Sequence, residues 1–353
     1  MSVDESRAPD ETDEETDRSG ASGFQRGVGR VASLAGGRGG ALIILVGLLV
    51  VFSIVSPDFR TGNNLLNILR QYSVPMILAV GMTLVIVARG IDLSVAATAA
   101  LSGSVMGVAF SSWGWPAPLA LLLGLASGAA VGAFNGFVIT RWHVPDFVAT
   151  LGTLTAVRGI ALLVTDGLPV PDAQAAVEGR TLPDSVLTLG GGTLGPIPLI
   201  ALVALVCVLV GAFVLGRTTL GRSAYAVGGN PDAALMSGIK VARTKISVYV
   251  FSGVLAAIAG FMLTGRQGSA NALSADQMEL QAIAAVVVGG TNLFGGEGRV
   301  SGTVIGMLVI GVLSNGLAII GVSDFWQRVV NGLVIVVVVA LDQWRRRAAR
   351  AVG

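Results

Sequence analysis

Long apolar runs with few charges between them limit this chain to one class of fold. Apolar residues make up 53% of the 353 residues and charged residues only 12%, against about 25% charged in a typical soluble domain. Of the 44 charged residues, 13 lie in residues 1–40 and four in residues 344–353, which leaves 27 for the 303 residues between. So few charges cannot cover a water-facing surface of that size. The chain is therefore predicted to be an integral membrane protein of the cytoplasmic membrane.

A membrane-spanning helix needs about 20 mostly apolar residues, and ten stretches of the sequence meet this need, some of them only as pairs split by a turn. They are residues 41–55, 65–88, 93–110, 118–140, 146–165, 197–216, 246–264, 280–294, 300–320 and 325–343. Without the tails and two polar loops, about 24 residues remain for each of ten spans, enough for one crossing and a tight turn. The predicted fold is all-α and polytopic, with about ten transmembrane helices.

Basic residues predict the orientation, because Lys and Arg concentrate on the cytoplasmic side of membrane proteins. They gather in residues 26–38, in the loop 217–245 and in residues 345–350. With ten spans these three segments lie on one side, so both termini and the loop 217–245 are predicted to be cytoplasmic. The loop 167–196, with Asp172, Glu178 and Asp184 against Arg180, is predicted to be external.

The predicted domains follow from these segments. Residues 1–40 form a disordered cytoplasmic tail, first acidic and then basic, residues 41–345 form the transmembrane domain, and residues 346–353 form a second basic tail. The 49 glycines lie largely within the spans. Small residues let helices approach closely in lipid, so a compact bundle is expected.

Several kinds of chemistry are excluded by composition. A single cysteine, Cys207, and a single histidine, His143, cannot build a Cys or His metal cluster, and a formal charge of +2 gives no reason to expect nucleic acid. Residues 289–298 (GGTNLFGGEG) do not match the phosphate-binding pattern GxxxxGK[ST], and neither lysine of the chain follows a glycine. We expect no cofactor, and we interpret this stretch, with Gly289, Gly290 and Gly296, as a tight cytoplasmic turn between the eighth and ninth spans.

A short capped helix is predicted in the loop 217–245. Asn230 suits the N-cap, Pro231 the first turn, Asp232 the positive end of the helix dipole, and Gly238 the C-terminal stop. A short helix with an apolar face in a cytoplasmic loop is either a structural loop element or a docking element for a partner's groove.

Several motifs of this sequence together resemble one family. Residues 232–238 (DAALMSG) look like the Glu-Ala-Ala-x-x-x-Gly coupling motif of ABC-importer permeases, with Asp in place of Glu. The chain also resembles ribose- and xylose-type permeases over about residues 41–345, in the stretches 81–86 (GMTLVI), 90–95 (GIDLSV), 149–154 (ATLGTL), 226–230 (AVGGN), 279–291 (ELQAIAAVVVGGT) and 295–298 (GGEG).

The resemblance implies the membrane-spanning subunit of an ATP-driven importer for a monosaccharide. It implies a second permease copy, as a homodimer in the lipid membrane, an extracytoplasmic sugar-binding protein, and a cytoplasmic ATPase that carries out the hydrolysis, so the chain itself is not an enzyme. It assigns ATPase coupling to Asp232, Ala233, Ala234 and Gly238, with Ala233 and Ala234 facing the partner. It also makes Asp92 a structurally fixed residue of its motif rather than a ligand-binding one.

Polar residues at membrane depth have two interpretations. Asp92 lies between two apolar runs, which indicates either a transport pathway or an interfacial turn near Arg89. Arg158 lies deep in the fifth predicted span and needs a carboxylate, carbonyl or water partner. The candidates for contact with the solute along the pathway are Asn135, Arg158, Gln281, Asn315 and Asn331. Each is either a contact for a sugar hydroxyl or a hydrogen bond between helices.

Three alternatives to a sugar permease were weighed. A related permease for a nucleoside, a branched-chain amino acid or a quorum signal is one, and scarce charge favours a neutral solute. An ion-coupled secondary carrier is another, but such carriers usually hold carboxylates within the membrane. An intramembrane enzyme is the third, and no nucleophile with a base can be assembled.

Overall fold

The fold was taken from a computed structural model, which describes residues 38–340 except 180, 331, 335 and 337–339. The first elements are α2 (Arg38–Val55), the 3-10 helix η1 (Pro57–Arg60), α3 (Gly62–Val87), α4 (Val95–Ser111), α5 (Ala117–Arg141) and α6 (Asp146–Val164). Next come α7 (Ala173–Val177), α8 (Asp184–Gly191), the strands β1 (Thr193–Leu194) and β2 (Ile197–Pro198), and α9 (Leu199–Arg217). The last are α10 (Thr219–Gly229), α11 (Pro231–Met236), α12 (Val241–Gln267), α13 (Met278–Val288) and α14 (Val300–Ile319).

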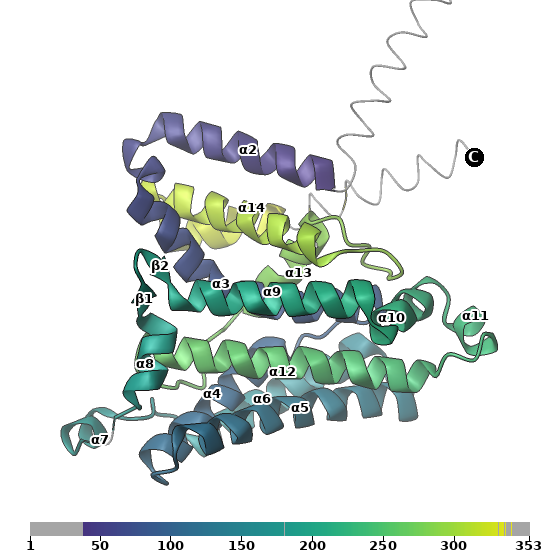
Figure 1. The fold of residues 1–353 in the computed structure, drawn as a ribbon, viewed down its shortest axis with the longest axis horizontal. Coiled ribbons are helices and arrows are strands. Elements are labelled where there is room, and N and C mark those ends of the chain that lie inside the picture. The colour runs from purple at the N-terminus through teal and green to yellow at the C-terminus, as the bar shows by residue number, and fades with distance from the viewer. Residues whose placement is uncertain (1–37, 180, 331, 335, 337–339, 341–353) are drawn as a thin grey trace, which may run out of the picture.

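The long helices form a bundle in which neighbours run roughly side by side (Figure 1). The two-stranded antiparallel hairpin β1–β2 and the short helices α7 and α8 lie at one end, and α10 and α11 lie at the other. We call these the α8 end and the α11 end. The loops predicted as 167–196 and 217–245 thus lie at opposite ends of the bundle.

Membrane-spanning length is found in six helices of the described residues: α3, α5, α6, α9, α12 and α14. Three apolar helices are shorter, namely residues 39–55, 95–111 and 278–288. The chain is therefore a helical, polytopic membrane protein, as predicted. Part of the tenth predicted span, 325–343, lies outside the described residues, and its described residues, 325–330, 332–334, 336 and 340, are all helical.

One predicted span is shorter than its predicted bounds. The span 280–294 overlaps the turn predicted at 289–298, and α13 ends at Val288, where that turn begins. Gly290 takes a φ of 84°, a backbone conformation that does not continue a right-handed helix. Glycine adopts it without the strain that a Cβ would cause. At about 1.5 Å per residue, the 11 residues of α13 extend roughly 16 Å, about half of the hydrocarbon layer.

The core is built around α3, most of which is buried. Glycines allow the neighbouring helices to approach each other closely. A Cβ added to Gly128 of α5 would overlap the carbonyl oxygen of Gly253 of α12, and a Cβ on Gly253 would overlap that of Gly128. The expected close packing of small residues is therefore confirmed at the contact between α5 and α12.

Candidate coupling and transport sites

The predicted capped helix is present as α11. The Asn230 side chain accepts hydrogen bonds from the backbone nitrogens of Asp232 and Ala233, both at 3.0 Å. Pro231 occupies the first turn, and Asp232 lies beside the positive end of the helix dipole. Gly238 follows the helix with a φ of 81°, in the left-handed region where glycine carries no Cβ penalty.

The exposed surface of α11 differs from the expected one. Ala234 is only 4% exposed and packs within this chain, so the expectation that it faces a partner is wrong. The reason is helical geometry, because Ala233 and Ala234 are one residue apart and point about 100° apart around the axis. Ala233 is exposed, and the large apolar side chains that project outward are Leu235, 61% exposed, and Met236, 90% exposed.

A groove of about 590 Å³ lies beside α11. Its walls come from Pro231 and Leu235 of α11, from the start of α12 and from the turn between α5 and α6, which includes His143 and Pro145. The wall from the α5–α6 turn was not predicted, because that turn lies about 90 residues before α11 in the sequence.

The helix before α11 connects it to the glycine-rich turn 289–298. A Cβ on Gly228 of α10 would overlap the carbonyl oxygen of Val87 and lie 2.5 Å from the nitrogen of Gly296. That nitrogen donates a hydrogen bond to the same Val87 oxygen at 2.9 Å. The ends of α3 and α10 and the turn therefore meet at one point.

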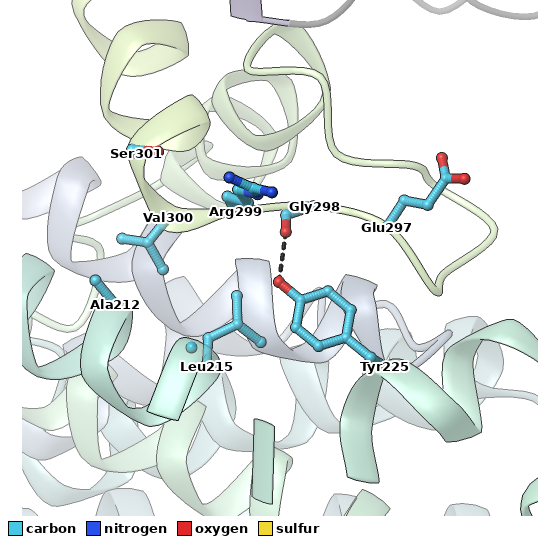
Figure 2. Close-up of a pocket in the computed structure, with 9 residues that line it drawn as sticks. Ala212, Leu215, Tyr225, Glu297, Gly298, Arg299, Val300 and Ser301 are labelled. Carbon is cyan, nitrogen blue, oxygen red and sulfur yellow. Dashed lines mark hydrogen bonds between the residues drawn. The ribbon is translucent and has the colours of Figure 1, made fainter. Parts of the chain in front are cut away.

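A second contact reinforces this junction, and Figure 2 shows it. The hydroxyl of Tyr225 on α10 donates to the carbonyl oxygen of Gly298 at 2.6 Å. Both residues line a cavity of about 650 Å³ between α9, α10 and the start of α14. The predicted tight turn is present, with φ of 84° at Gly290 and 78° at Gly296. Gly289, at its start, packs against Gly302 of α14 without room for a Cβ.

Asp92 lies in the connection between α3 and α4 and is buried. Its Oδ1 accepts from the nitrogen of Ser94 at 3.0 Å and from the Ser94 hydroxyl at 2.6 Å, and its Oδ2 accepts from the hydroxyl of Ser252 at 3.3 Å. Asn135 on α5 donates to the Ser94 hydroxyl at 2.8 Å. The carboxylate thus ties α4, α5 and α12 together.

A neighbouring network was missed by sequence reasoning. Lys245 Nζ lies 3.0 Å from both carboxylate oxygens of Asp146. The Tyr249 hydroxyl lies 2.9 Å from Asp146 Oδ2 and 3.1 Å from the carbonyl oxygen of Ile91, and donates its single proton to one of them. These residues hold in place the connection that contains Asp92. They could not be grouped from the sequence, because the start of α6 and the start of α12 come together only in the folded structure.

The five pathway candidates do not converge. Asn135 belongs to the Asp92 network near the α11 end, and Asn315 of α14 exchanges two amide hydrogen bonds, at 2.9 and 3.0 Å, with Asn64 of α3. These two residues bond neighbouring helices, as the structural alternative predicts. Gln281 is half-buried on α13, and Asn331 lies outside the described residues.

Arg158 has the partners that its depth requires. Its Nη1 donates to the carbonyl oxygens of Ala272 and Ser274 at 3.2 and 3.4 Å, and its Nη2 lies 3.6 Å from Asp276 Oδ1. The segment that supplies these groups leads directly into α13. There Glu279 is buried, at 8% exposure, and sequence reasoning had noted it only as part of a motif.

The described residues hold no group of three or more His, Cys, Asp or Glu side chains suited to a metal ion. The apolar helices of spanning length and the capped loop helix at one end define a polytopic membrane protein with an exposed loop helix. Residues 64–339 match the family described as branched-chain amino acid transport system / permease component, and the chain belongs to this family of ABC-importer permeases.

Individual relatives are similar over most of their length. The ribose import permease protein RbsC of Bacillus subtilis (strain 168) is 43% identical over 296 residues, which cover 84% of this chain and 89% of the relative. The fructose import permease protein FrcC of Rhizobium meliloti is 36% identical, with 87% and 86% covered. The xylose transport system permease protein XylH of Escherichia coli (strain K12) is 34% identical, with 82% and 87% covered. No solved structure gives a significant match.

Membership of this family makes the chain a multi-pass membrane permease and a transport subunit rather than an enzyme. An importer of this kind works with an ATPase and a solute-binding protein.

Proposed function

We propose that this chain is the membrane-spanning subunit of an ATP-driven importer for a monosaccharide. The observation that carries the proposal is the 43% identity to a ribose import permease over 84% of the chain. The fructose and xylose permeases among the relatives agree on the same class of solute. Scarce charge within the bundle suits a neutral solute better than the zwitterionic amino acid in the family's description.

The orientation proposed is that the α11 end faces the cytoplasm. This end carries Arg217 and Arg222 of the α9–α10 region and Lys240, Arg243 and Lys245 around the start of α12, and basic residues favour the cytoplasmic side. The chain then crosses the membrane ten times with both termini inside, and the segment 268–277 and α13 together make one crossing.

Coupling to the ATPase runs through α11. Leu235 and Met236 project from it beside the groove, which suits insertion of an apolar segment of the ATPase. Because α10 precedes α11 and packs on the turn 289–298 at Gly228 and Tyr225, a movement of the docked helix reaches α13 directly.

Two copies of the chain enclose one path. The outer surface of α6 supports this arrangement, because it presents Thr155 and two glycines, Gly152 and Gly159, with open space where a Cβ would lie. Nearby Asp276 is 66% exposed, and a carboxylate is costly against lipid. The exposed apolar side chains of α2 and α9, such as Ile54 and Phe213, suit lipid instead.

Reconstitution tests the proposal. Proteoliposomes would contain this permease, its ATPase and its sugar-binding protein, with radiolabelled ribose, xylose, fructose or isoleucine outside. ATP-dependent uptake of one or more sugars is expected. Uptake of isoleucine alone, or sugar uptake driven by a proton gradient without the ATPase, would overturn the proposal.

Labelling tests the orientation. Leu194→Cys in the hairpin and Met236→Cys on α11 place a thiol on exposed positions at opposite ends. With Cys207→Ala as the background, a membrane-impermeant maleimide should label whole cells at residue 194 only. Labelling of both positions from outside would contradict ten crossings.

A further inference from the structure

Glu279 lies near the middle of the membrane, and two independent measures of depth agree. The turn that follows α13 lies at the α11 end, because the nitrogen of Gly296 is bonded to the carbonyl oxygen of Val87 there. From this turn, α13 extends back roughly 16 Å into the bundle. On α6, Asp146 is tied to the α11 end through Lys245 and Tyr249. Arg158 follows 12 residues later, roughly 18 Å along the axis. Both estimates therefore place Arg158 and the start of the half-length helix α13 at a similar depth in the membrane.

One carboxylate oxygen at this level lacks a donor. Glu279 is 8% exposed, and its Oε2 is buried without a hydrogen-bond partner among the residues that the structure describes. A buried acceptor left in this state costs about 1–3 kcal/mol, more for a charged group. A hydroxyl that reaches Glu279 Oε2 and donates a hydrogen bond to it would therefore be bound favourably.

The charges around Glu279 define what can bind. Arg158 already has two carbonyl oxygens and Asp276 as partners, so Arg158, Asp276 and Glu279 together carry a net charge of −1. This charge disfavours an anion, and Glu279 Oε2 requires a hydrogen-bond donor, which the hydroxyl of a neutral sugar supplies. A sugar hydroxyl donates to a carboxylate and accepts from a guanidinium at once.

The proposed path reaches this cluster from the open side of α13. Asp276, three residues before Glu279, and Leu280, directly after it, are both exposed, and Gln281 is half-buried. A discontinuous helix that starts near mid-membrane is also where transporters often bind their solute.

We infer that Glu279, with Arg158 beside it, is a sugar-hydroxyl recognition point halfway along the path, and that it determines which sugars pass. This inference rests on the proposed sugar transport. Glu279 Oε2 accepts a hydrogen bond from one hydroxyl of the passing monosaccharide, and Arg158 positions that hydroxyl and its neighbour.

A double-substitution cycle, which varies both residue 279 and the hydroxyl groups of the sugar, tests this inference. The reconstituted importer would be driven by saturating sugar-loaded binding protein, with D-ribose and its 2-deoxy, 3-deoxy and 5-deoxy analogues, for wild type, Glu279→Gln and Glu279→Ala. Wild type should move one deoxy analogue about 10- to 100-fold more slowly than ribose. In Glu279→Ala that ratio should fall to within about twofold, and Glu279→Gln, which keeps an acceptor, should be intermediate.

The control carboxylate is Asp324, which follows α14 and accepts a hydrogen bond from Gln327 at 3.4 Å, so Asp324→Asn should leave the ratios unchanged. If Glu279→Ala slows every sugar by one common factor, or if wild type does not distinguish any analogue, Glu279 has only a structural role and the inference is wrong. If wild type moves no sugar at all, the proposed function fails instead, which is a separate result.

Discussion

The carbonyl oxygen of Val87, at the end of α3, accepts a hydrogen bond from the nitrogen of Gly296 at 2.9 Å. The same oxygen leaves no room for a Cβ on Gly228 of α10. Three segments that are distant in the sequence therefore meet beside the loop helix α11. This junction connects the proposed ATPase contact to the half-length helix α13.

The first prediction tests this junction with a matched pair of glycines. Gly228→Ala should lower ATP-driven uptake at least about tenfold, because the added methyl group overlaps backbone atoms that cannot move independently. Gly229→Ala is the control, since nothing lies within 4 Å of a Cβ there. Uptake, membrane abundance and ATPase retention would be measured together. Equal effects of the two substitutions would contradict a role for the junction.

The second prediction concerns the surface of α11. Met236→Glu should leave membrane abundance unchanged, because the side chain is 90% exposed, and should weaken co-purification of the ATPase severely. Ala234→Glu should instead reduce abundance, because that position is buried within the chain and a charge there lacks a partner. Retention of the ATPase by Met236→Glu, measured by pull-down, would remove α11 from the interface.

The third prediction concerns Gly238, at a φ of 81°. Gly238→Val should strain the end of α11 by about 1–2 kcal/mol, because a β-branched residue is disfavoured in the left-handed region. Gly238→Asn should be milder, since Asn tolerates this conformation. Coupled uptake per permease should therefore rank Gly, Asn and Val in decreasing order. Full uptake by the Val variant would show that the turn is not needed.

The fourth prediction concerns the pair Asp146 and Lys245, whose side chains are 19% and 16% exposed. Asp146→Asn or Lys245→Met should each destabilise the detergent-purified permease by roughly 3 kcal/mol, because one charge stays behind without its partner. The double variant should be less destabilised than the sum of the two single variants. Thermal unfolding measures this, and additive losses would indicate that the two charges do not interact.

The fifth prediction separates structural amides from a solute contact. Asn315→Ala and Asn64→Ala should each lower thermal stability by about 1 kcal/mol, because each breaks the same reciprocal pair. Neither should change the ranking of sugars in uptake assays. A changed ranking of sugars for Asn315→Ala would indicate that Asn315 contacts the solute after all.

The local features of this protein were determined by its sequence alone. The apolar runs predicted most of the long helices within a few residues, because helix hydrogen bonds in lipid are satisfied within each segment. The residue types at 230–238 predicted the cap, the first turn and the glycine stop of α11, since each acts within one turn of helix. The need of Arg158 for carbonyl and carboxylate partners also followed from its depth alone.

Tertiary structure decided what depends on contact between distant segments. The turn from Gly289 was predicted, but its overlap with the predicted span 280–294 was settled only by the structure, because glycines also continue other helices of this bundle. Ala234 turned inward, and Asn135 and Asn315 found partners on neighbouring helices, for reasons outside their own segments. Glu279 was singled out only by burial beside Arg158. An apolar pattern gives the length of a helix, whereas packing between helices decides which polar atom is left without a partner.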